Sequence, residues 1–233
     1  MRRIWAVVAR EWWVTTRAYR LSFFASALMG ALFTLFAGRI LYTSVFEGRV
    51  TETFAASAGT SDYLTYLTLG VVDNAFTFRL LYPVRNVLEE QRQGTLAPLV
   101  MTGLRSGAFQ AGCVGFSAAY ALVEVAIILA AALPWSGARL DAGAPALLAI
   151  LLASALALGG LSLLLAAIVL AVGDRLVVES VAFALMALLG GVAFPASYLP
   201  RVAQLAGEAL PLTWMLRALR QHVLRGDGLE ALL

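Results

Sequence analysis

Four long stretches of this chain contain no aspartate, glutamate or arginine. They run from Leu21 to Gly38, Ser106 to Val123, Ala142 to Gly173 and Ser180 to Pro200. A helix that crosses a hydrocarbon layer about 30 Å thick needs roughly 20 apolar residues, so these stretches predict membrane spans. The composition agrees: 61% of the 233 residues are hydrophobic and 13% are charged, against about 45–50% and about 25% in soluble domains. We therefore expect an all-α, polytopic membrane helical bundle.

A fifth span is predicted over residues 63–82, where an apolar run carries Asp73, Asn74 and Arg79. It supplies the hairpin partner that is needed between the first and third charge-free stretches. Within a single transmembrane domain over residues 1–233, the five predicted spans cover residues 21–42, 63–82, 106–133, 144–172 and 180–198.

The arginines predict the direction of the spans, because basic residues are retained on the cytoplasmic side. Five arginines precede the first span and three lie between the second and third, whereas loops 43–62 and 134–143 hold one each. We therefore expect a multi-pass protein of the cell (plasma or inner) membrane with a cytoplasmic N-terminus. The arginine-rich segment 199–226 is the exception, since this topology places it outside.

Residues 1–20 predict an uncleaved amphipathic helix that lies in the membrane interface. At 100° per residue, apolar side chains gather on one face and arginines seven apart lie opposite: Ile4, Trp5, Val8, Trp12 and Tyr19 against Arg3, Arg10 and Arg17. Such a helix serves as a membrane anchor or contacts a partner protein.

The composition argues against catalysis. All 17 basic residues are arginine, so the chain has neither the lysine of a phosphate-binding loop nor one for a Schiff base. One cysteine, Cys113, and one histidine, His222, do not suffice for a zinc site of the usual ligands. Because the arginines are scattered over segment ends, they do not form a nucleic-acid-binding stripe. We expect no enzyme, no metal and no cofactor in this chain.

The predicted cytoplasmic segment 83–105 differs in composition from the rest of the chain. Pro83 predicts a break in the descending span, Gly94 the end of a polar helical piece, and Thr95 the cap of a second short helix. The apolar face of that second helix consists of Leu96, Leu99, Val100 and Leu104. An apolar ridge in water indicates a docking surface, and a helical hairpin lying on the bilayer is the alternative.

One pattern in this segment is an acidic pair, a short polar gap and Gly-Thr-Leu: Glu89, Glu90, Gly94, Thr95 and Leu96. It resembles the permease subunits of type-2 ABC exporters. A second resemblance to this family lies in Phe194-Pro195, Leu199-Pro200, Leu210–Trp214 and Ala218–Arg220, which are similar to the end of its fifth span and its short external re-entrant helices.

The resemblance implies that segment 83–105 is a coupling segment docked on a separate ATP-binding-cassette subunit. The residues implied to contact that subunit are Glu89, Glu90, Gly94, Thr95, Leu96, Leu99, Val100 and Leu104. It further implies a second permease copy, in a homodimer or heterodimer, with ATP and magnesium on the partner subunit. Segment 199–226 would form external re-entrant or amphipathic helices.

Polar residues inside the predicted spans are costly and face a bundle interior or a water-filled route. Asp73, Asn74 and Glu124 therefore line a translocation path or serve helix packing. Small residues at every fourth position, Gly107, Ala111, Gly115 and Ala119, predict a face for close helix contact.

Together these features predict the membrane-spanning permease subunit of an ATP-driven exporter. A secondary, proton-coupled transporter with Asp73 and Glu124 as proton sites is an alternative, and a membrane anchor that recruits a soluble partner is another. The family has a sixth span, so we expect this sequence to be a shortened form of a chain whose sixth span begins just beyond Glu230.

Overall fold

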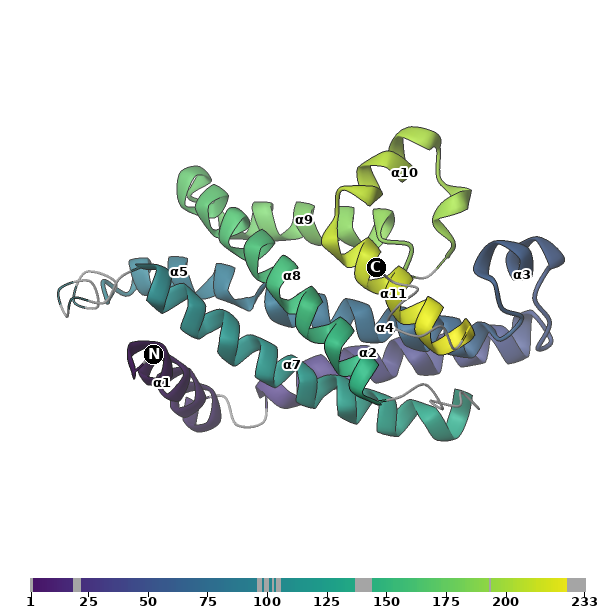
Figure 1. Cartoon of the computed structure of the whole chain (residues 1–233), viewed down its shortest axis with the longest axis horizontal. Coiled ribbons are helices and arrows are strands. Elements are labelled where there is room, and N and C mark those ends of the chain that lie inside the picture. Colours follow the sequence, from purple (N-terminus) through teal and green to yellow (C-terminus); the bar gives the residue numbers. More distant parts are fainter. Residues whose placement is uncertain are drawn as a thin grey trace.

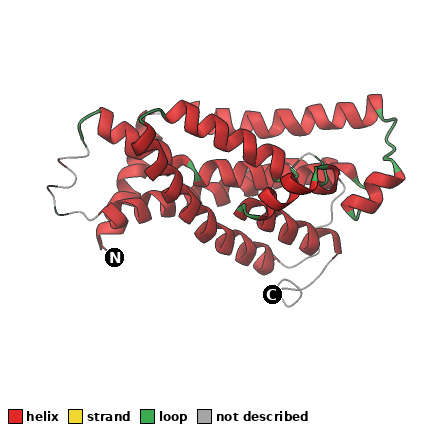
Figure 2. Cartoon of the chain, turned by 90° about the horizontal axis from the view of Figure 1, so that it is seen from above, coloured by secondary structure: helices red, strands yellow, loops and turns green. Residues whose placement is uncertain are grey.

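The computed structural model describes residues 2–18, 22–95, 98, 101, 103, 106–136, 144–192 and 194–225. In these ranges every regular element is a helix, which confirms the all-α expectation (Figure 2). The elements are α1 Arg2–Ala18, α2 Ser22–Ile40, a π-helical turn Leu41–Val45, α3 Glu52–Ala58, α4 Tyr63–Leu80, α5 Tyr82–Arg92, α7 Ser106–Ser136, α8 Ala144–Val172, α9 Arg175–Leu189, a 3-10 turn Ala196–Tyr198, α10 Arg201–Glu208 and α11 Pro211–Arg225.

Three helices of the described ranges are long and apolar enough to cross a membrane. Their apolar stretches are Leu28–Val45, Gly107–Pro134 and Pro145–Val172. In Figure 1, α2 runs roughly along the longest axis of the molecule, and α7 and α8 cross it obliquely. They expose large side chains such as Phe33 and Leu156, which is the surface expected for contact with lipid.

Helix α4 lies at the centre of the bundle, where it contacts α2, α7 and α11. Thirteen of its 18 residues are buried. Phe76 on α4 belongs to the same apolar core as Ile128 on α7, Leu158 on α8 and Leu219 on α11. Because α4 meets protein on most sides, its polar residues are shielded from lipid. This explains how a span with two charged residues is accommodated.

Helix boundaries follow local sequence signals. Asp62 caps α4 by accepting hydrogen bonds from the backbone N–H of Leu64 and Thr65. The predicted break at Pro83 and stop at Gly94 are confirmed: α5 begins at Tyr82 with Pro83 in its first turn and ends at Arg92, and Gly94 has a φ of +70°.

The fifth predicted span, 180–198, differs from the helix that is observed. Asp174 caps α9 ahead of Arg175, and α9 ends at Leu189 before two glycines, of which Gly191 has a φ of +70°. Its 15 residues rise about 22 Å, which is less than the hydrocarbon thickness of about 30 Å. The helix alone is therefore too short to cross the hydrocarbon layer, and the chain turns after it at Gly190 and Gly191.

Helix α11 packs back against α8 and α4, so that the chain after the turn is held to the bundle (Figure 1). Its buried face consists of Leu212, Met215, Leu216 and Leu219, each at most 2% exposed. Helix α10 connects this inner helix to the 3-10 turn.

Candidate functional site

Helix α1 docks on α7 through a face that its sequence pattern does not single out. The buried side chains are Val7, Glu11 and Thr15, spaced four residues apart. Gly112 of α7 allows the close approach, because an added Cβ would lie 2.5 Å from the Cβ of Val7. The aromatic residues, including Trp5, remain exposed, as an interfacial helix requires.

Ionic contacts join α1 to α5. Arg10 pairs with Glu11 at 3.1 Å and with Glu90 of α5, and the side-chain amide of Asn86 donates to Glu11 at 3.0 Å. Burial raises the pKa of Glu11, while the neighbouring Arg10 opposes that rise. A buried carboxylate is stabilised only by such partners, so this cluster fixes α1 against α5.

The structure separates the residues predicted to contact an ATP-binding subunit. Glu90 is buried and accepts hydrogen bonds from Arg10 and Thr95, whereas Glu89 is exposed and accepts one from Gln93 at 2.7 Å. Gly94 and Thr95 are exposed. The other four predicted contacts, Leu96, Leu99, Val100 and Leu104, lie outside the described residues.

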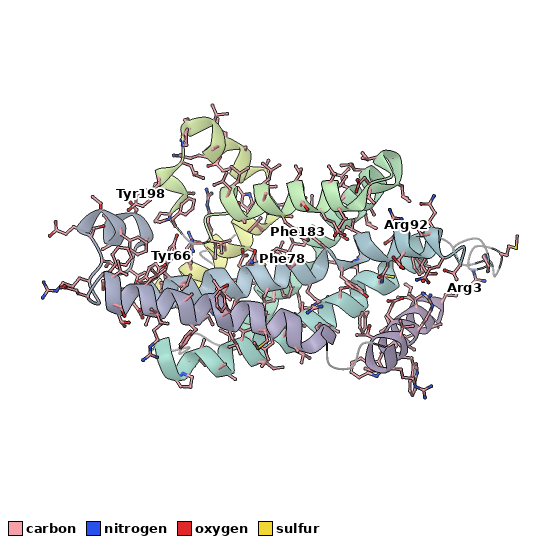
Figure 3. The ribbon with its side chains drawn as sticks, turned by 180° about the vertical axis from the view of Figure 1, so that it is seen from behind. Arg3, Tyr66, Phe78, Arg92, Phe183 and Tyr198 are labelled. Atoms are coloured by element: carbon pink, nitrogen blue, oxygen red, sulfur yellow. The ribbon has the colours of Figure 1, made fainter. Side chains whose placement is uncertain are left out.

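A further contact of α1 reaches Gly103, beyond the end of α5. Arg3 of α1 donates to the backbone carbonyl of Gly103 at 2.6 Å. In Figure 3, Arg3 and Arg92 lie at the same end of the molecule, opposite Tyr66 and Tyr198. The start of α1, the end of α5 and Gly103 therefore lie together at that end.

A polar cavity lies between α2, α4, α7 and α9. Its volume is about 420 Å³, and its walls include Thr34, Asn74, Glu124 and Glu179. Phe78 and Phe183 also line the cavity, and their rings stack with centroids 4.1 Å apart. Both lie about midway along the molecule (Figure 3). The volume falls in the range of small-molecule sites, about 300–1,000 Å³.

Charged side chains face this cavity. The Nε of Arg79 donates to the Oε2 of Glu124 at 2.8 Å, and the guanidinium of Arg79 lies over the ring of Tyr120, 4.3 Å from its centroid. Glu179 of α9 is 7% exposed. The sequence prediction missed Glu179, because the charge-free stretch begins one residue later. The sequence signal that could have located Glu179 in a helix is the N-cap residue Asp174, because it predicts that α9 begins at Arg175, before Glu179.

Asp73 does not share this cavity with Asn74 and Glu124. Its side chain is fully buried, both oxygens lack a hydrogen-bond partner among the described residues, and Arg220 of α11 interacts with it electrostatically. Arg220 lies 3.5 Å from the ring centroid of Tyr66 and donates to the carbonyls of Gly191 and Val192, each at 3.1 Å. Burial lowers the pKa of Arg220.

The small-residue face predicted on α7 is exposed and is not the site of the closest helix contact in the described part of the chain. Gly107, Ala111, Gly115 and Ala119 are all exposed. The close contact with α1 forms instead at Gly112, one position further along the helix than Ala111. No group of three histidine, cysteine or acidic side chains within the described residues is placed to hold a metal ion.

Comparison with known families decides the identity of the chain. The family model for the ABC-2 type transporter matches residues 2–224. The chain belongs to this family. No curated protein and no solved structure matches it.

As an ABC-2 permease, the chain is a membrane protein of the ABC transporters. The match extends from α1 to α11, so it includes α1 and α5 with their mutual contacts as well as α10 and α11. Glu11 and Arg220 of this permease have partners far away in the sequence, Asn86 and Gly191 respectively. A pattern of neighbouring residues does not reveal such contacts.

Proposed function

We propose that this permease is the membrane-spanning half of an ATP-driven exporter. It acts with a second permease copy, in a homodimer or a heterodimer, in the cell membrane with its N-terminus in the cytoplasm. Each copy binds a separate ATP-binding-cassette subunit, which holds ATP and magnesium. The observation that carries the proposal is a pair of contacts made by α1 at a single end of the bundle. Arg10 pairs with Glu90 of α5, and Arg3 donates to the carbonyl of Gly103.

These contacts provide a route for force from a docked ATPase. A displacement of segment 83–105 is passed to α1 through the Arg3–Gly103 and Arg10–Glu90 contacts. It is passed to the central helix α4 through α5, which follows α4 after a single residue. The closed, ATP-bound pair of ATPase subunits then shifts the bundle toward the conformation to which that pair binds more tightly.

The proposed docking residues are the exposed Glu89, Gly94 and Thr95, together with the apolar side chains Leu96, Leu99, Val100 and Leu104. Glu90 has a different proposed role: it holds α5 against α1 through its ion pair with Arg10. Asn74 and Glu124 are proposed to line the translocation path, because both face the cavity between α2, α4, α7 and α9. Asp73 is proposed to act outside that path, in holding α11 through Arg220.

Co-purification with an ATP-binding-cassette protein encoded next to this gene tests the docking. Leu96→Asp and Leu99→Asp should abolish co-purification and the stimulation of ATP hydrolysis, because two carboxylates buried in an apolar groove cost several kcal/mol. Val202→Asp is the matched control, since Val202 is 80% exposed on α10, far from α1 and α5 (Figure 1). Unchanged binding in the Leu96 and Leu99 variants would refute the docking surface. Transport driven by a proton gradient without ATP would favour the secondary transporter instead.

A further inference from the structure

One side of helix α4 faces the turn that follows α9. Tyr66, Gly70 and Asp73 are spaced four and three residues apart, so they lie on this side of the helix. Gly70 lets the turn come close, because a Cβ there would lie 2.3 Å from the carbonyl oxygen of Val192. The hydroxyl of Tyr66 donates to the carbonyl of Gly191 at 3.4 Å. The turn therefore lies directly on α4.

Arg220 of α11 holds the same turn. Its Nη1 donates to the carbonyl of Gly191 and its Nη2 to that of Val192, each at 3.1 Å, while its guanidinium covers the ring of Tyr66. Backbone carbonyls beyond a helix end need donors from elsewhere when they are shielded from water. Arg220 supplies these donors, so it joins the turn to both α4 and α11.

Next to these bonds, three buried polar atoms have no hydrogen-bond partner in the described part of the chain. They are the Nε of Arg220 and both carboxylate oxygens of Asp73. The two side chains interact electrostatically, yet no hydrogen bond joins them. Buried polar atoms normally find partners, and an exception calls for an explanation. The guanidinium has two sets of acceptors within its surroundings, the carbonyls that it binds and the carboxylate that it does not.

The two sets of acceptors belong to different helices. The carbonyls lie in the turn after α9, whereas Asp73 lies on α4, which leads into α5 after a single residue. A displacement of α4 relative to α9 therefore changes which acceptors lie nearer to Arg220. Sliding of packed helices past one another is a common route by which a helical bundle switches between two arrangements.

A pocket of about 240 Å³ lies beside the turn, with walls contributed by α3, the turn itself and α11. Tyr66 and Arg220 both line it. In Figure 3, Tyr66 lies at the end of the molecule opposite Arg3 and Arg92. The pocket is therefore at the end that is proposed to face outward.

We propose that Arg220 is a switch at the outer exit of the permease: it binds the carbonyls of Gly191 and Val192 when the exit is closed, and the carboxylate of Asp73 when the exit is open. The proposal rests on the proposed transport function, because it describes how the outer end of the path opens. Release of the two carbonyls frees the turn from α11, and water that enters from the pocket takes the place of the guanidinium as their donor.

A cysteine in the pocket reports its opening. Thr213 lines the pocket and is 3% exposed, so Thr213→Cys in a Cys113→Ser background reacts with an impermeant maleimide only when the pocket opens. The labelling rate is measured on the purified full-length permease in lipid nanodiscs. Asp73→Asn should lower this rate about tenfold, because a hydrogen bond to a charged group contributes at least this factor to an equilibrium.

Asp174→Asn is the matched control. Asp174 is an exposed residue that caps the other end of α9, and asparagine caps a helix equally well. The same chemical change at this position should leave the labelling rate as it is.

A double substitution separates the switch from a merely structural role of Asp73. Arg220→Met should raise the labelling rate, because the closed turn loses its donors. In that background Asp73→Asn should have no further effect, since the carboxylate acts only through Arg220. If Arg220→Met fails to fold, the comparison of Asp73→Asn with Asp174→Asn decides.

Three results would overturn the proposal: equal labelling in the parent and in Asp73→Asn, no labelling in any variant, or independent effects of the Asp73 and Arg220 substitutions. The measurement uses the permease without an ATPase. Loss of ATPase docking therefore leaves its result intact, and a negative result here leaves the docking experiment to decide the proposed function.

Discussion

The contact between α1 and α7 depends on the missing side chain of Gly112. A Cβ at this position would lie 2.5 Å from the Cβ and 2.6 Å from the Cγ1 of Val7, and 3.2 Å from the carbonyl oxygen of Ile4. Carbon atoms pack best about 3.5–4.0 Å apart. Since the Cβ of Val7 is fixed to its backbone, rotation of the side chain cannot relieve the clash. In Gly112→Ala, α1 must therefore retreat by roughly 1 Å.

Such overpacking costs about 1–3 kcal/mol, and a domain of this size loses about 2–4 °C of melting temperature per kcal/mol. Gly115→Ala is the control, because its Cβ would meet only the Cγ2 of Val8 at 3.9 Å. Both variants gain the same helix propensity of about 0.5–1 kcal/mol, so their difference isolates the clash.

The assay can use the chain's own reporter. Cys113 is 1% exposed and belongs to the small apolar cluster that includes Val7, so a thiol-reactive fluorophore reports when this region opens on heating. Gly112→Ala should melt several degrees below Gly115→Ala and should also stimulate a bound ATPase less. Equal midpoints in the two variants would show that α1 does not pack on α7 at this glycine.

Three further outcomes are expected. Gly70→Ala should destabilise the protein by about 1–3 kcal/mol, because its Cβ would meet a backbone oxygen at 2.3 Å, whereas Gly30→Ala meets nothing within 4 Å and should be neutral or stabilising in a thermal melt. Arg79→Met alone should cost about 3–5 kcal/mol by leaving a buried carboxylate unpaired, and adding Glu124→Leu should recover most of that loss in denaturant unfolding. In a cysteine-free background, Ser57→Cys should react with an impermeant thiol reagent in intact cells. Protection of that cysteine would contradict the external placement of α3.

The sequence predicts the main helices because the bilayer imposes a simple rule. A helix that crosses it must be long and largely uncharged, and this rule alone locates the stretches that become α2, α7 and α8. Pro83 and Gly94 are equally readable, since their backbone restrictions act locally. Helix α4 was predicted from the need for a hairpin partner between two other spans. Its hydropathy is a weak guide, because it is surrounded by protein and carries charged residues.

The candidate site is less readable because its contacts join distant positions. Arg10 and Glu90 are 80 residues apart, and Arg79 and Glu124 are 45 apart. A pattern of neighbouring residues carries no information about such pairs. Hydrophobic patterning assigns the aromatic face of α1 to the membrane interface but does not identify the face that packs on protein, which contains Glu11 and Thr15. Specific partners on α5 outweigh hydrophobicity at that interface.

The adjacent residues Asp73 and Asn74 show how α4 joins the two ends of the permease. Successive residues of a helix point about 100° apart, and these two face different sides: Asn74 lines the cavity, while Asp73 faces the side on which α11 supplies Arg220. Two residues after Tyr82, where α5 begins, Val84 is buried in a separate small cluster with Val169 of α8. Helix α4 therefore lines the cavity with one face and contacts α11 with another. It is followed by α5, which begins the segment proposed to bind the ATPase. A rotation of α4 small enough to keep its core contacts would change the cavity wall and the Asp73–Arg220 interaction together, which is the arrangement that an alternating-access transporter requires.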